Sequence, residues 1–75
     1  MNYYYNEISQ GYAVTLNGKT CNFNFIKLEH NRCTLGFDIY DDSWRSFTDT
    51  EINTMLDFLL AQNEIQLLIE EINNG

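Results

Sequence analysis

At 75 residues and a net charge of −7, this chain is long enough for one domain and too acidic to bind nucleic acid directly. Hydrophobic residues make up 44% of it and aromatic residues 15%, which predicts a folded core and argues against intrinsic disorder. A domain of this size buries only roughly 60% of its unfolded surface, so a deep active site that excludes water is not expected. We therefore expect one small acidic domain over residues 1–75.

The start of the chain, Met1 to Glu7, has no basic region followed by an apolar run. No later segment approaches the roughly 20 apolar residues of a membrane span. Only Cys21 and Cys33 are present, too few for a small secreted fold held by disulfides, so we expect two free and largely buried thiols. These features predict a cytoplasmic protein that does not bind membranes.

A β-hairpin is predicted at Asn17-Gly18, which separates two segments of alternating apolar and polar residues. Asn-Gly is the preferred two-residue hairpin loop because both central residues need a positive φ. The tyrosines at 3–5, with Ile8, either extend the first strand or form a short edge strand. The loop makes one face apolar on both strands through two facing pairs, Val14 with Cys21 and Tyr12 with Phe23.

A third antiparallel strand is predicted after a turn at His30-Asn31. The middle strand is less regular, because its apolar residues change phase after Phe25. Either a bulge near Phe25 or a longer turn at Glu29 to Arg32 would reconcile the two phases. The alternating apolar residues of the third strand are Cys33, Leu35, Phe37 and Ile39.

A helix is predicted to begin at residue 48 or 49, where Thr48 and Glu51 match a capping box. Phe47 and Ile52 occupy the two positions of a hydrophobic staple around it. The expected fold is therefore α+β. It comprises a three- or four-stranded antiparallel β-meander packed by the C-terminal α-helix, in the order β-β-β-α.

The C-terminal helical segment carries two apolar stripes, one over 52–59 and one over 65–72, whose centres differ by roughly 150° around a straight helix. One helix cannot bury both stripes against one sheet. Either it breaks near Asn63, with Asn63 and Gln66 capping a second short helix, or it continues and offers the second stripe to another copy. The continuous helix predicts a homodimer interface formed by Phe58, Ile65, Ile69 and Ile72.

No constellation of residues points to catalysis, a cofactor or a metal. His30, the only histidine, lies in a predicted turn, where a solvated residue is expected rather than a general base. Cys21 and Cys33 lack the spacing of a zinc site, and the acids at 38, 41 and 42 lack the pattern of a calcium loop. No glycine-rich phosphate loop is present. The sequence therefore predicts a protein that is not an enzyme.

Charge is concentrated in the last part of the chain. Residues 46–75 carry six acids and no base, net −6, whereas residues 1–45 carry five acids and four bases. Such a field favours basic protein surfaces as partners. On a continuous helix, Asp57, Glu64 and Glu71 would lie in one line, roughly 10.5 Å apart, and could imitate phosphates. The alternative is the solvated face of an amphipathic helix.

Further acids and two hot-spot residues lie close to this row in sequence. Asp41, Asp42 and Glu51 could extend the acidic surface. Trp44 and Arg45 lie in the connection between strand and helix, and both residue types are enriched at binding hot spots. Alternatively, Trp44 folds over the sheet edge as part of the core.

These patterns lead to a hypothesis about function. We expect a small acidic inhibitor, encoded by a phage or another mobile element, that blocks the nucleic-acid-binding site of a host defence or DNA-processing enzyme, in the manner of anti-CRISPR and anti-restriction DNA mimics. One alternative is a regulatory adaptor or homodimer that binds a protein ligand by apolar contacts. Another is an immunity protein against a nuclease toxin, which relies on the same acidic surface.

Overall fold

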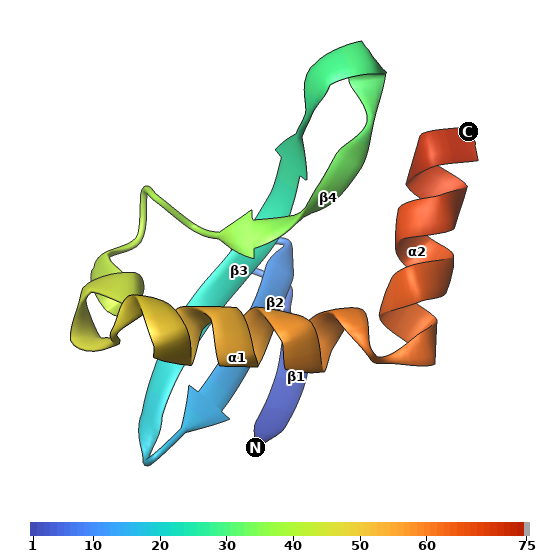
Figure 1. Ribbon diagram of the computed structural model, residues 1–75. Coiled ribbons are helices and arrows are strands. Elements are labelled where there is room, and N and C mark those ends of the chain that lie inside the picture. The colour runs from blue at the N-terminus through green and yellow to red at the C-terminus, as the bar shows by residue number, and fades with distance from the viewer. Residues whose placement is uncertain (75) are drawn as a thin grey trace.

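The computed structural model describes residues 1–74, except the side chain of Asn31. Four strands form an antiparallel meander in the order β1-β2-β3-β4, and two helices follow (Figure 1). This confirms the expected α+β fold with four strands. The strands are β1 (Asn2–Asn6), β2 (Gly11–Leu16), β3 (Lys19–Lys27) and β4 (Cys33–Phe37); the α-helices are α1 (Asp49–Leu60) and α2 (Asn63–Asn74); two 3₁₀ turns are η1 (Glu29–Asn31) and η2 (Asp42–Ser46).

The β2–β3 hairpin forms as its sequence predicts. Asn17 and Gly18 have φ values of 54° and 77°, which is the left-handed conformation that a type I′ loop requires. The two predicted facing pairs, Val14 with Cys21 and Tyr12 with Phe23, are both present. The tyrosines at 3–5 form the separate edge strand β1, and Ile8 lies exposed in the turn that follows it.

The β3–β4 connection uses the longer turn and no bulge. The register runs without interruption from Phe23 opposite Phe37 to Lys27 opposite Cys33. The prediction that Ile39 continues this strand is wrong, since β4 ends at Phe37 and Ile39 is exposed. The strand stops there because the chain turns, with the backbone N–H of Tyr40 donating to Asp38 Oδ1 at 3.0 Å.

The core lies between the helices and one face of the sheet. That face carries alternate residues of all four strands, and both α-helices of the described residues 1–74 pack on it rather than on the opposite face. Both helices contribute to the core, including the second one. The largest fully buried side chains are Val14, Cys21, Phe23, Leu35, Met55, Leu59 and Ile65.

Helix α1 begins with the predicted capping box. The Thr48 backbone N–H donates to Glu51 Oε1 at 2.9 Å, and the Glu51 N–H donates to Thr48 Oγ1 at 3.2 Å. Phe47 and Ile52 are both buried beside this start. These bonds satisfy two amides at the N-terminal end of the helix and fix the residue at which α1 begins.

The helix breaks near Asn63, so the continuous-helix alternative is wrong. The Gln62 carbonyl accepts the N–H groups of Ile65 and Gln66, both at 3.1 Å, and α2 starts afresh from it. The side chains of Gln62 and Gln66 bond to carbonyls of α1, whereas Asn63 is simply the first helical residue. Helix α2 is 12 residues long, as is α1. The break turns the second apolar stripe back toward the sheet.

Candidate functional site

The described residues contain no cluster of three His, Cys, Asp or Glu side chains that could hold a metal ion. His30 is exposed in the turn between β3 and β4. Cys21 is buried and Cys33 half-buried, and both are free, as expected. Burial raises the pKa of the Cys21 thiol, which keeps it protonated at neutral pH.

The two helices form a layer that carries acids and no base. Five of the six acids are exposed, and Glu51 is half-buried in its capping box. All four basic side chains come from the strands and turns before Phe47. Charge is therefore segregated between the two layers of the fold. The acids of the helical layer are Asp49, Glu51, Asp57, Glu64, Glu70 and Glu71.

The predicted straight row of carboxylates does not form. Asp57 lies on α1, whereas Glu64 and Glu71 lie on α2, which turns away from α1 after the break (Figure 1). Glu64 also accepts a hydrogen bond from the Tyr3 hydroxyl of β1, and this bond raises the pKa of Tyr3. Asp57 and Glu71 are exposed and make no side-chain hydrogen bond or ion pair within residues 1–74.

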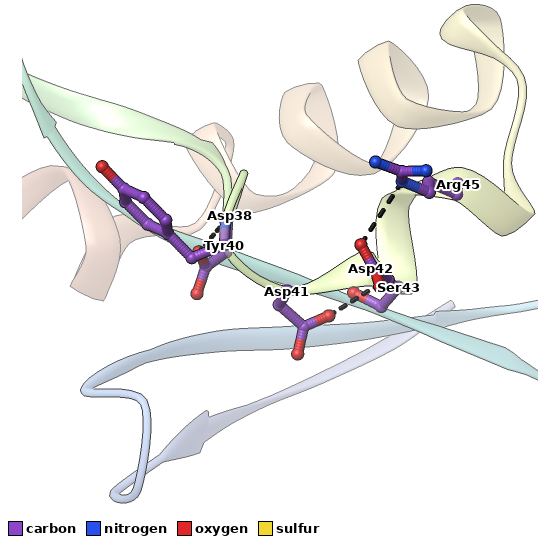
Figure 2. A network of polar contacts seen from close by, with 6 residues as sticks. All are labelled: Asp38, Tyr40, Asp41, Asp42, Ser43 and Arg45. Atoms are coloured by element: carbon purple, nitrogen blue, oxygen red, sulfur yellow. Dashed lines mark hydrogen bonds and ion pairs between the residues drawn. The ribbon is translucent and has the colours of Figure 1, made fainter.

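Asp41 organises the loop that leads from β4 to α1. Its Oδ1 accepts the backbone N–H of Ser43 at 2.7 Å, and its Oδ2 accepts Asn22 Nδ2 at 3.0 Å. The Ser43 hydroxyl in turn accepts the Asn22 backbone N–H at 3.0 Å. The bonds from Ser43 lower the pKa of Asp41. Asp41 therefore fastens this loop to β3, beyond the end of β4, rather than standing free for a partner. Figure 2 shows the part of this network between Asp41 and Ser43.

Replacement of Asp41 by alanine should lower the free energy of unfolding by about 1 kcal/mol, the usual cost of losing a capping side chain. Because the pKa of Asp41 is lower when folded, its contribution is complete at neutral pH and is lost as the pH falls through that folded value. Urea unfolding at several pH values measures this. Asp42→Ala is the matched control and should change stability by less than about 0.5 kcal/mol. Equal losses from both variants would contradict the assignment.

Trp44 and Arg45 project from η2 in different ways. Trp44 packs against Phe37, with ring centroids 5.3 Å apart, and joins the margin of the core. Trp44 is therefore part of the core margin, as the alternative expected, and it leaves the outward backbone groups of Leu35 and Phe37 unbonded within residues 1–74. Arg45 lies over the Trp44 ring, 5.2 Å from its centroid. It also pairs with Asp42 at 3.3 Å, in the open (Figure 2). Such an exposed pair contributes little stability, so Arg45 can exchange partners readily.

The four residues expected at a dimer interface do not share one outer surface. Ile65 is fully buried within the chain's own core, which corrects its placement in a partner surface. Phe58 packs on Tyr3 at 5.7 Å, and Ile69 is partly buried against the core. Among the four, only Ile72 is exposed, at 47%, and Leu67 and Leu68 of the same helix are exposed as well. Sequence reasoning missed Leu67, although its position two residues after Ile65 places it on the opposite side of the helix.

A groove of about 410 Å³ runs beside strand β4, and sequence reasoning did not foresee it. Its walls come from β3, β4, η2 and α1, segments far apart in the chain, so no local pattern could have indicated it. Its only charged lining residue is Asp49. The lining consists of Ile26, Leu35, Gly36, Phe37, Trp44, Asp49, Ile52, Asn53 and Leu56.

The described residues thus offer surfaces for recognition, an acidic helical layer and a groove beside β4. Within residues 1–74, no helix is long and apolar enough to cross a membrane. Comparison of the chain with protein-family models, curated proteins and solved structures finds no match.

Proposed function

We propose that this protein is a non-catalytic inhibitor whose acidic helical layer binds the basic, nucleic-acid-binding surface of another protein. The observation that carries the proposal is the segregation of charge. Residues 49–74 hold six acids and no lysine or arginine, and five of these acids are exposed. An ordinary solvated helix usually mixes signs, because oppositely charged neighbours one turn apart stabilise it.

The arrangement supports recognition of a basic site without a regular row of carboxylates. Asp57, Glu70 and Glu71 are exposed and unbonded within the described chain, so they can approach lysine and arginine side chains without first breaking a bond. Like charges spread over one layer produce a field that steers a basic partner toward it. The same field repels nucleic acid itself.

The proposed target class is supported by charge and size. A site lined by basic side chains to hold phosphates is complementary to this layer. We place the target among host defence or DNA-processing enzymes, with the inhibitor encoded by a phage or mobile element of the anti-CRISPR or anti-restriction type and acting in the cytoplasm. An immunity protein against a basic nuclease toxin would use the same layer.

The test compares two triple variants with the same net charge. Neutralising Asp57, Glu70 and Glu71 as Asn, Gln and Gln removes three charges from the helical layer. Neutralising Glu7, Glu29 and Asp42 as Gln, Gln and Asn removes three exposed charges elsewhere. Each changes the net charge from −7 to −4. At about 0.5 kcal/mol per charge, the first variant should bind its target about tenfold more weakly, and the second within about twofold of the original.

The measurement begins with capture of the target from a host lysate on the immobilised protein, followed by competition against a nucleic acid duplex in a gel-shift assay. The original chain should displace the duplex, and added salt should abolish the difference between the two variants. A target that keeps its duplex while bound to this protein would refute the proposal. Equal effects of the two variants would refute the role of the helical layer.

A second candidate is an adaptor that binds a protein ligand by apolar contacts. It is favoured by the exposed Leu67, Leu68 and Ile72 of α2, of which Leu67 is 56% exposed. Binding of this kind survives high salt, because burial of apolar surface does not depend on charge screening. A captured partner that resists salt, or a homodimer that forms through α2, would therefore favour this candidate.

A further inference from the structure

Strand β4 is an edge strand, and its ladder pattern shows which backbone groups face outward. In an antiparallel pair, successive residues alternate between bonding to the neighbouring strand and pointing away from it. The Asp38 N–H bonds to the Asn22 carbonyl at 2.9 Å beyond one end of β4, and the Leu28 N–H bonds to the Arg32 carbonyl at 2.6 Å beyond the other. Counting inward from both ends, the N–H and C=O groups of Cys33, Leu35 and Phe37 face away from β3.

One of these three outward positions is already filled by a side chain. The amide of Asn73, near the end of α2, accepts the Cys33 N–H at 2.6 Å and donates to the Cys33 carbonyl at 3.2 Å. It therefore occupies both groups as a residue of a fifth strand would. No described group bonds in this way to Leu35 or Phe37.

The groove beside β4 lies along this free part of the edge. Phe37, Trp44 and Leu56 line it from the helix side of the sheet. Ile26 lines it from the opposite side, because it pairs with Thr34 and its side chain lies beside Gly36 on the face that carries neither α-helix. A groove lined from both faces of a sheet has the strand edge as its floor. A fifth strand laid there would meet apolar side chains on both of its own faces.

We propose that the open edge of β4 at Leu35 and Phe37 binds an extended, mainly apolar segment of another protein that carries a lysine or arginine where it passes Asp49. The backbone groups specify an extended chain, which is the mode of β-strand addition. The apolar walls take its apolar side chains on both faces, and Asp49, the only charge among the described lining residues, selects a base. A second copy is disfavoured as the occupant, since each copy carries a charge of −7.

The probe is a displayed library of random ten-residue linear peptides, selected on the full chain. Selection should enrich mainly apolar segments that carry at least one Lys or Arg. Binding of the strongest selected peptide is then measured against two variants of exposed α1 residues, Asn53→Arg in the groove and Thr54→Arg outside it. Asn53→Arg should weaken binding at least tenfold, because it places a bulky cation in the groove, and Thr54→Arg should change it less than twofold.

Amide hydrogen exchange gives a second readout, which depends on the backbone. Saturation with the peptide should slow exchange at the Leu35 and Phe37 amides at least tenfold relative to the free chain. Exchange at the Cys33 amide should change little, since that amide is already bonded to Asn73. Unchanged exchange at Leu35 and Phe37 would overturn the proposal.

Other outcomes are equally decisive. Failure to enrich any peptide, or equal binding by the two arginine variants, would overturn the proposal. So would a dimer in light scattering that Asn53→Arg disrupts, because the occupant would then be a second copy. The inference is independent of the acidic-inhibitor function. Both arginine variants change the charge of α1 equally, and neutralising Asp57, Glu70 and Glu71 leaves the groove lining intact.

Discussion

Truncation of Ile65 to alanine should lower the free energy of unfolding by about 2–5 kcal/mol, because it removes three carbons from a fully buried side chain and leaves a cavity. A domain of this length has a total stability of about 4–11 kcal/mol, so the variant should be close to unfolding. Urea denaturation followed by circular dichroism measures the loss.

Ile72→Ala is the matched control, since it makes the same chemical change in the same helix. Ile72 is 47% exposed, and alanine is the better helix former, so the cost should stay below about 1 kcal/mol. Similar losses at both positions would mean that α2 does not pack against the sheet through Ile65. If Ile65→Ala barely changed the free energy of unfolding, and if stability rose with protein concentration, the apolar stripe over 65–72 would instead form a dimer interface.

Ile65 and Ile72 also show what the periodicity of the sequence can and cannot predict. The two stripes, 52–59 and 65–72, were correctly identified, and so was their mismatch on a straight helix. Periodicity could not decide between a helix that breaks near Asn63 and a continuous helix that dimerises, because both arrangements bury the second stripe. The choice depends on the carbonyls freed at the break, and the side chains of Gln62 and Gln66 bond to them. Such bonds have little signature in sequence.

Features of the fold and of the candidate site were predictable when they depend on residues close in sequence, and not when they depend on residues far apart. The capping box at Thr48 and the hairpin at Asn17-Gly18 were predictable, because each depends on residues a few positions apart. The role of Asp41 was not, since its partner Asn22 lies 19 residues away and belongs to β3. The free edge of β4 was equally hidden, because it depends on where β4 ends and on Asn73, 40 residues beyond Cys33.

Replacement of Gly11 by alanine should destabilise the fold by about 3 kcal/mol or more, because the added methyl group has no space. A Cβ atom at Gly11 would lie 2.2 Å from the Phe23 carbonyl oxygen and 3.2 Å from the carbonyl carbon. Both atoms belong to the backbone of β3, so relief requires the strands to separate where β2 begins. Thermal and urea unfolding of the variant measure the cost.

Gly36→Ala is the control, because it replaces a glycine of the same sheet by alanine at a position where the added methyl group meets no backbone atom. Its Cβ atom would come within 2.9 Å of Ile26 Cδ1, the free end of a flexible and partly exposed side chain. That side chain can rotate away, and alanine also reduces the entropy of the unfolded chain, so the change should stay within about 1 kcal/mol. If Gly11→Ala were as mild as Gly36→Ala, the close approach of β2 to β3 at Phe23 would be wrong. The start of β2 would then lie farther from β3.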